Sequence, residues 1–196
     1  DPAYIVDGVL TDGEAWVGLN TTTLGSDTAT VTFTSTDDGQ VGDFSQYMDL
    51  FLIIYGRNAS ADTGADQAHM VLNNVSATGA YSYQYLRGNG SAASAAAADQ
   101  TTCPVGYFIR NNETANIFCA STIHLFDINS GKYKSVLVQF ACEIEDGSGY
   151  DYAGLFAATA NSQAPITEID LTLPYGNDWL TGSSFSLFGV LPRMVA

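Results

Sequence analysis

The most constraining feature of the sequence is an alternation of apolar and polar residues with a period of two, which recurs along most of the chain. In residues 28–35, threonines alternate with alanine, valine and phenylalanine. A strand places successive side chains on opposite faces of its sheet, so this pattern predicts a strand with one apolar and one polar face. Residues 47–55 form a nearly continuous apolar run instead, which predicts a central strand covered on both sides.

About ten segments carry such strand-like patterns, and turn-forming pairs such as Asp38-Gly39 and Ser130-Gly131 separate them. Short strands at regular spacing, without intervening helical patterns, predict an all-β fold, an antiparallel sandwich or barrel. A slip of the period within residues 166–173 indicates a β-bulge. The predicted strands are 28–35, 47–55, 66–73, 80–86, 105–110, 121–128, 133–144, 151–158, 165–173 and 184–191.

Two stretches depart from the pattern. Residues 91–98 are rich in alanine and too short for a stable helix, so we expect a loop with at most one helical turn. Residues 1–27 are the least strand-like part, and two interpretations stay open: an extended arm that packs on a neighbouring subunit, or an edge strand with a loop. We therefore expect a single globular domain, with residues 1–46 as an N-terminal arm or first strands and residues 47–196 as the β-sandwich.

The charge balance excludes two classes of partner. The chain has 6 Lys and Arg against 21 Asp and Glu, a formal net charge of −15. Nucleic-acid binding needs clustered basic residues, and so does electrostatic docking on an anionic membrane, so neither partner is expected. The longest strongly apolar run, 50–55, is far shorter than a membrane span of about 20 residues. With 46% apolar residues, the chain has enough hydrophobic material for a packed core.

The three cysteines, Cys103, Cys119 and Cys142, have no C-x-x-C spacing. With only His69 and His124 beside them, they do not provide a zinc site. Either one disulfide and one free thiol, or three reduced cysteines in the core, would account for an odd number. We favour structural thiols, because a free cysteine commonly behaves as a small buried hydrophobe.

Five N-x-[ST] triplets occur along the chain. In a secreted eukaryotic protein they would indicate glycosylated loops. A chain rich in Ser, Thr and Asn also produces such triplets by chance, and we favour this second interpretation. The asparagines concerned are Asn20, Asn58, Asn74, Asn89 and Asn112.

The sequence offers little for catalysis. None of the motifs G-x-S-x-G, H-E-x-x-H, the P-loop or G-x-G-x-x-G occurs. His69 and His124 both lie in strand-like segments, where a packed or solvent-facing histidine is commoner than a member of a Ser-His-Asp triad. We therefore expect no enzyme activity, no catalytic residue, no cofactor-binding residue and no metal-binding residue.

Carboxylates and aromatic residues leave alternatives to that expectation. The acidic group Glu143, Glu145, Asp146 and Asp151 provides either a glycosidase pair or simply solvated strand ends. That group, or the pair 37–38, also has the oxygen ligands that Ca²⁺ takes, although the EF-hand spacing is absent.

Two tyrosine stripes provide either a glycan-stacking face or an aromatic surface packed in a core or an oligomer interface. We favour packing. The stripes are Tyr81, Tyr83 and Tyr85, and then Tyr150 and Tyr152.

Residues 164–171, a short turn and residues 179–190 resemble the closing hairpin of a group of tailed-phage virion proteins. Those proteins end in a pattern like s-x-I-x-x-I-x-l, turn, F-x-x-G-S-x-f-s-L-Y-G-I. Residues 83–91 are similar to their Y-x-L-x-G-x-G strand and turn, and residues 128–134 to the strand before their central strand. The resemblance covers roughly residues 47–191, and only the last 25 or so residues of it are specific.

Two positions depart from that pattern, because Phe188 stands where tyrosine is usual and Trp179 where phenylalanine is usual. The resemblance implies a jelly-roll-like β-sandwich in a virus particle, on the capsid exterior or in the tail. It implies a non-enzymatic capsid decoration (cement) protein, commonly a homotrimer, whose partners are the major capsid protein or other virion proteins. The alternative is a receptor- or glycan-binding module of a tail fibre, and a glycan hydrolase is a weaker third.

Overall fold

The computed structural model describes residues 5–6, 9–10, 15–89, 93–142 and 151–191, with backbone alone for 5–6, 9–10 and 93–99. Within these residues the chain forms fourteen strands and two 3₁₀ turns. They are β1 (Ile5–Val6), β2 (Val9–Leu10), β3 (Trp16–Thr23), β4 (Thr30–Thr34), η1 (Phe44–Gln46), β5 (Asp49–Gly56), β6 (Ala65–Leu72), β7 (Tyr81–Gly88), β8 (Ala93–Gln100), β9 (Cys103–Ile109), β10 (Cys119–Phe126), β11 (Lys134–Cys142), β12 (Tyr152–Ala160), β13 (Glu168–Thr172), η2 (Pro174–Gly176) and β14 (Ser184–Val190).

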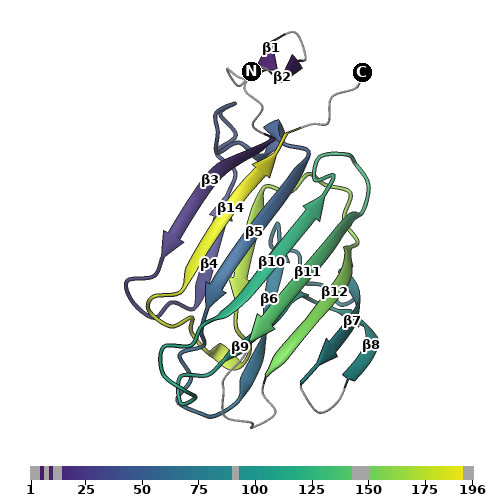
Figure 1. Ribbon diagram of the computed structural model, residues 1–196. Helices are drawn as coiled ribbons and strands as arrows, with labels where there is room; N and C mark the ends of the chain where they lie inside the picture. The colour runs from purple at the N-terminus through teal and green to yellow at the C-terminus, as the bar shows by residue number, and fades with distance from the viewer. Residues whose placement is uncertain (1–4, 7–8, 11–14, 90–92, 143–150, 192–196) are drawn as a thin grey trace.

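Two antiparallel sheets form a sandwich (Figure 1). The large sheet has eight strands in the order β3-β14-β5-β10-β11-β12-β7-β8, and the small sheet has four in the order β4-β13-β6-β9. The chain crosses between the sheets repeatedly, for example from β4 to β5, β5 to β6 and β13 to β14. The predicted class, an all-β antiparallel sandwich of jelly-roll-like type, is confirmed.

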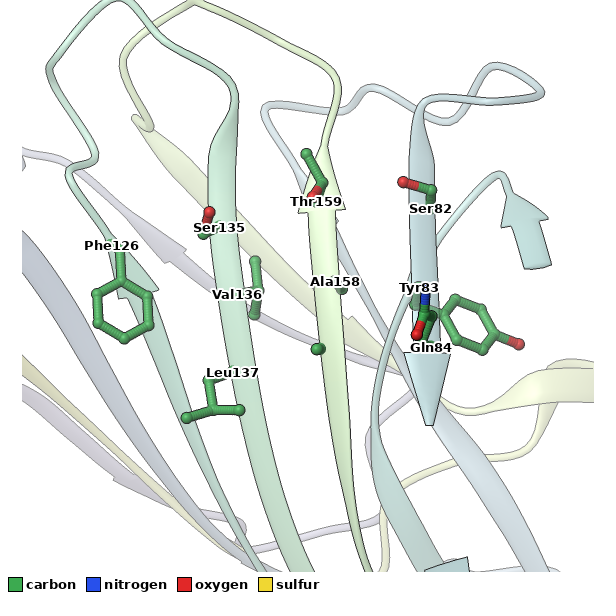
Figure 2. A pocket seen from close by; sticks show the side chains of 10 residues that line it. Ser82, Tyr83, Gln84, Phe126, Ser135, Val136, Leu137, Ala158 and Thr159 are labelled. Carbon is green, nitrogen blue, oxygen red and sulfur yellow. The ribbon is translucent and has the colours of Figure 1, made fainter. Parts of the chain in front are cut away.

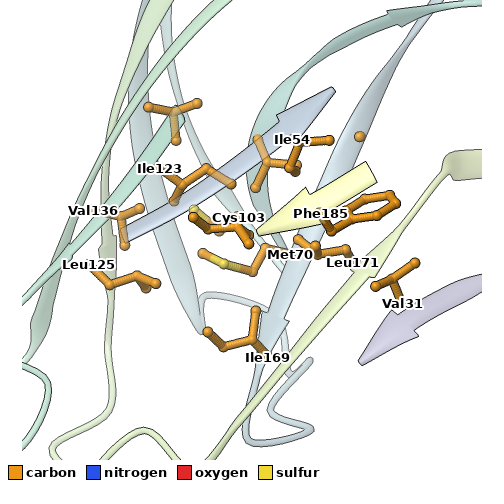
Figure 3. Close-up of a cluster of buried hydrophobic side chains, with 14 of the residues drawn as sticks. Val31, Ile54, Met70, Cys103, Ile123, Leu125, Val136, Ile169, Leu171 and Phe185 are labelled. Atoms are coloured by element: carbon orange, nitrogen blue, oxygen red, sulfur yellow. The ribbon is translucent and has the colours of Figure 1, made fainter. Parts of the chain in front are cut away.

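The core lies between the two sheets, where the apolar side of each alternating strand faces inward (Figure 3). In β11, every second residue from Lys134 to Cys142 is buried, as the period of two requires. Val31, Met70 and Ile169 come from the small sheet and meet Ile54 from the large sheet in this core (Figure 3). Burial of these side chains is the main force that holds the sandwich together.

All ten predicted strands are present, but some details of the prediction are wrong. Residues 93–100 form a strand, β8, in place of the expected loop, because all eight positions pair with β7. Pairing with a neighbouring strand here overrides the weak strand preference of alanine. The slip of the period marks no bulge either: β13 spans Glu168–Thr172 in regular register, and Ile166 belongs to the preceding loop.

β5 is covered on one side only, although its apolar run predicts burial on both. Ile53 is 40% exposed and Tyr55 49% exposed. The reason is that the small sheet covers one face of the large sheet, and the described residues place no layer on the other. For residues 1–27 the sequence allowed two interpretations, an extended arm or an edge strand with a loop. Within that range, residues 16–23 form the edge strand β3 beside β14.

The structure joins Cys119 and Cys142 in a disulfide between the neighbouring strands β10 and β11. The expectation of three reduced thiols is therefore wrong for this pair, because the register Ala120↔Ala141 brings the two cysteines opposite each other. Cys103 is the buried free thiol that the sequence indicated, and burial raises its pKa to about 12. At that pKa the thiol stays protonated and unreactive.

Reduction of the Cys119–Cys142 disulfide is expected to lower the free energy of unfolding by about 3 kcal/mol. The two cysteines are 23 residues apart in sequence, and the bridge removes chain entropy from the unfolded state. Urea unfolding with and without a reductant measures the loss. The double variant Cys119→Ser, Cys142→Ser is the control, and its stability should not respond to the reductant. Equal stability of the oxidised and reduced wild-type chain would contradict the prediction.

Candidate binding face

The large sheet has a broad face that points away from the small sheet, and we call it the outer face. Cross-strand register aligns its residues in rows, one of which runs Phe188, Phe51, His124, Leu137 and then into β12 and β7. Its described side chains are Trp16, Thr21, Thr23, Asp49, Phe51, Ile53, Tyr55, Ser82, Gln84, Leu86, Ala120, Thr122, His124, Phe126, Ser135, Leu137, Gln139, Ala141, Ala153, Leu155, Ala157, Thr159, Ser184, Ser186, Phe188 and Val190.

Large apolar side chains are concentrated on the outer face. Ten large hydrophobic side chains are exposed in the part of the chain whose side chains are described, and six of them lie on this face. Leu86 is 56% exposed and Trp16 is 47% exposed. The remaining four of these six side chains are Ile53, Tyr55, Leu137 and Leu155. The register places Thr122 and Gln139 between Ile53 and Leu155, so the apolar side chains are interspersed with neutral polar groups. Exposed apolar surface of this extent is typical of interaction sites.

The described side chains of the outer face are also nearly uncharged, and the register places one further acidic residue, Asp99 of β8, opposite Ser82. Among the described side chains of this face, Asp49 is the only carboxylate and His124 the only basic group, and the two are bonded to each other. His124 Nε2 lies 2.9 Å from Asp49 Oδ2, and the Asp127 backbone N–H donates to Asp49 Oδ1 at 2.8 Å. Asp151 stands at the rim, one residue before β12.

The opposite side of the sandwich has the reverse character. On β13, Glu168 and Asp170 alternate with the buried Ile169 and Leu171, so both carboxylates point outward. Asp170 accepts a hydrogen bond of 2.5 Å from the hydroxyl of Thr32 on β4. Among the described side chains, the carboxylates other than Asp49 thus lie on the small sheet and in the loops.

Aromatic rings form a row across four strands at one end of the outer face. The Trp16 ring lies 4.7 Å from that of Phe51, and Phe51 lies 5.8 Å from the His124 ring. His124 stacks on Phe126 at 3.7 Å, and Phe188 lies 6.4 Å from Trp16. We call these five residues the aromatic row. They come from β3, β5, β10 and β14, which are distant in sequence.

Beside the aromatic row the outer face is hollowed into an open depression of about 710 Å³. Figure 2 shows Phe126 and Leu137 on one side of it, with Gln84 of β7 on the other. The small side chains of Ala157 and Thr159 on β12 form its floor. Neutral hydroxyl and amide groups provide the polar part of the lining, so the depression suits an uncharged occupant.

The predicted tyrosine stripe on β7 is in the core, which confirms the packing interpretation. Tyr81 is buried, its hydroxyl accepts a hydrogen bond from the Leu72 N–H at 2.8 Å, and burial raises its pKa to about 12. Tyr83 and Tyr85 lie against the ring of Phe156. Of the second stripe, Tyr152 packs on Tyr107 at 4.7 Å, and Tyr150 lies outside the described residues.

The candidate carboxylates do not form a site within the described residues. Glu143, Glu145 and Asp146 lie outside them, and only Asp151 of that group is described. Asp38 accepts hydrogen bonds from the Thr36 hydroxyl and the Gln40 N–H, which lower the pKa of its carboxyl and fix a turn. No group of three or more His, Cys, Asp or Glu side chains in the described part is arranged to hold a metal ion.

Neither histidine has a catalytic arrangement among the described residues, where no hydrogen bond joins either ring to a serine. His69 is packed in the small sheet with its Nδ1 2.8 Å from the Thr102 hydroxyl, and burial lowers its pKa. His124 belongs to the aromatic row, where its ring packs between those of Phe51 and Phe126, and this packing accounts for a histidine at this position. Both are packed residues, as the strand-like context indicated.

The lowered pKa of His69 makes stability dependent on pH. The unfolded chain binds a proton at this residue more readily, so its contribution is complete above about pH 6.5 and is lost as the pH falls below that value. We expect the difference in melting temperature between wild type and His69→Gln to shrink as the pH is lowered from about 7.5 to about 5. Parallel pH profiles for the two proteins would contradict this assignment.

The N-x-[ST] triplets differ in accessibility. Asn58 is fully buried, and its amide donates to Asp66 at 2.6 Å, so this position has no room for a glycan. Asn20, Asn74 and Asn112 are exposed, and Asn89 is half-buried. The chance interpretation therefore holds for Asn58 and stays a prediction for the others.

Comparisons with known proteins give no family assignment: no family model matches the chain, and no curated protein matches it. Among solved structures, an engineered GH43 glycoside hydrolase is 15% identical at a TM-score of 0.35, over 92% of this chain and 38% of that one. A CBM40 module of the Ruminococcus gnavus IT-sialidase, bound to α2,6-sialyllactose, is 7% identical at a TM-score of 0.30, over 90% and 95%.

A leech intramolecular trans-sialidase is 10% identical at a TM-score of 0.25, over 91% of this chain and 26% of that one. The chain thus spans less than half the length of both enzymes. At these TM-scores the likenesses say nothing about activity or ligand. Separately, none of the helical segments in the described residues is long and apolar enough to cross a bilayer.

Proposed function

We propose that the protein is a non-enzymatic structural component of a virus particle, a capsid decoration (cement) protein that stabilises contacts between capsid subunits. The observation that supports an assembly role is the outer face, which is apolar and nearly neutral in a chain of net charge −15. A protein that acts alone has no use for such a face, and a component of an assembly buries it. The virus particle as the setting comes from the C-terminal sequence resemblance.

In this role the two sides of the sandwich have different tasks. The outer face provides apolar surface for contacts within the assembly, and the acidic small sheet faces solvent. Like charge on the solvent side keeps free copies soluble and keeps them away from DNA. The free energies of the contacts made by many copies add. A modest contribution from each copy therefore raises the stability of the whole shell.

Copy number on purified virions tests this proposal. A decoration protein is expected at several hundred copies per particle in a quantitative gel, in a fixed ratio to the major capsid protein. A handful of copies would overturn the decoration role and favour a tail component. Absence from the particle would overturn the virion setting altogether.

A second candidate is a glycan-binding module of a tail fibre, and one observation favours it. Trp16 is 47% exposed beside Phe51, and an exposed indole is a surface on which a sugar ring stacks. Glycan-array binding that Trp16→Ala abolishes would favour this candidate. Tyr175→Ala is the control, because Tyr175 is 88% exposed in η2, outside the outer face. Loss of binding in both variants, or in neither, would count against it.

A further inference from the structure

We propose that the occupant of the outer face is another copy of this chain, so that the protein assembles through its large sheet. This inference deepens the proposed function, on which it rests, because it names the partner of the outer face. Three properties of the face support it: its size, its lack of charge and the shape of its surface.

The outer face is large enough for a stable interface. Eight strands about 4.8 Å apart extend over about 38 Å, and strands of seven to nine residues are about 24–30 Å long. The area is therefore on the order of 900 Å², against about 800 Å² per partner in a standard protein interface. The six exposed large apolar side chains spread over β3, β5, β7, β11 and β12, so that an occupant would cover most of this area.

The distribution of charge makes the outer face the side through which two copies can meet. As whole molecules two copies repel each other, because each has a formal charge of −15. Carboxylates of both copies would face each other if the small sheets met, since Glu168 and Asp170 point outward there. On the outer face the described carboxylate, Asp49, is 3% exposed and already bonded to His124. Apart from β8, where the register pairs Asp99 with Ser82, two outer faces can therefore approach without unpaired charges between their described side chains.

The surface of the outer face provides both protrusions and hollows. Leu86, Leu137 and Leu155 protrude, while the open depression has a floor of Ala157 and Thr159. A second depression lies over Ala120, Ala141 and Ala153. In a symmetric assembly a surface must fit the same surface of another copy, or an adjacent part of it. A face that has both protrusions and hollows meets that requirement. The small, neutral residues between the leucines allow close approach of two sheets.

The test is the mass of the purified full-length chain by sedimentation equilibrium over a series of concentrations. We expect a multiple of 20.8 kDa for wild type. Leu137→Asp and Leu155→Asp each place a charge in the interface and should weaken association by at least about tenfold. The matched control is Val75→Asp, because Val75 and Leu137 are both 38% exposed and Val75 lies outside the outer face. Its association should equal that of wild type.

A monomeric wild-type chain would overturn the inference, and so would variants that associate as tightly as wild type. Circular dichroism and the melting temperature show that each variant is folded, and two separate leucine positions protect the test against the failure of one variant. The proposed function fails independently. A monomer that is abundant on virions overturns this inference alone, whereas an oligomer that is absent from virions overturns the virion role alone.

Discussion

Replacement of Arg57 by alanine is expected to lower the free energy of unfolding by about 3–5 kcal/mol, because the variant leaves a buried set of carbonyl groups without a donor. Arg57 follows β5 and is only 2% exposed. Its two terminal nitrogens donate hydrogen bonds of 2.7–3.2 Å to five backbone carbonyls in the loop between β9 and β10. The carbonyls belong to Arg110, Asn111, Glu113, Thr114 and Ile117.

Chemical denaturation of the purified variants measures this effect. Arg57→Lys should lose less than Arg57→Ala, since an ammonium group keeps the charge but cannot reproduce the planar fork of the guanidinium. The surface control is Lys132→Ala, which breaks only an exposed ion pair with Asp127 and should change stability by less than about 1 kcal/mol. A loss below about 1 kcal/mol for Arg57→Ala would show that the loop does not depend on this side chain.

Replacement of Trp179 by alanine is expected to cost about 3–5 kcal/mol through the cavity that it leaves. The Trp179 side chain is fully buried, with ring centroids 4.9 Å from Phe108 and 5.0 Å from Phe185. Its Nε1–H donates to the Leu171 carbonyl at 3.1 Å. Trp179 thus connects both sheets to the segment between β13 and β14, two strands that lie in different sheets and do not form the hairpin that the sequence resemblance implied.

Trp179→Phe separates the two contributions of this residue, and thermal denaturation of both variants provides the measurement. Phenylalanine fills most of the cavity but leaves the Leu171 carbonyl without its donor, so a loss of about 1–3 kcal/mol is expected. Equal losses for the alanine and phenylalanine variants would mean that the hydrogen bond, and not the packing, dominates.

The strands could be predicted from the sequence because burial on one face imposes the period of two directly. The pattern of β11 alternates at every residue, and its predicted range, 133–144, contains the observed strand. β8 could not be predicted in this way, because the sequence Ala-Ser-Ala-Ala-Ala-Ala has no contrast between its faces. Its strand state depends on the partner β7, which is a tertiary property.

The candidate site was less predictable than the fold, because it is assembled from separate strands. Trp16, Phe51, Phe126 and Phe188 lie in four segments that are far apart in sequence, and only the strand order β3-β14-β5-β10 places them in one row. The tyrosines of β7 formed a visible stripe within one segment, but that stripe faces the core. A periodic pattern shows that two faces differ and leaves open which of them the second sheet covers.

Whether the outer face is covered can be measured by the reactivity of a single introduced cysteine. Gln139→Cys places a thiol in the centre of the face, and Thr34→Cys places one on the outside of the small sheet; both residues are exposed in the isolated chain. The native cysteines give little background, since two form a disulfide and Cys103 is buried.

Maleimide labelling rates of the purified, assembled variants, each divided by the rate in the unfolded chain, give the decisive comparison. If copies associate through the large sheet, Gln139→Cys is expected to react at least about tenfold more slowly than Thr34→Cys. Equal protection at the two positions, or slower labelling of Thr34→Cys, would contradict an assembly that buries the outer face.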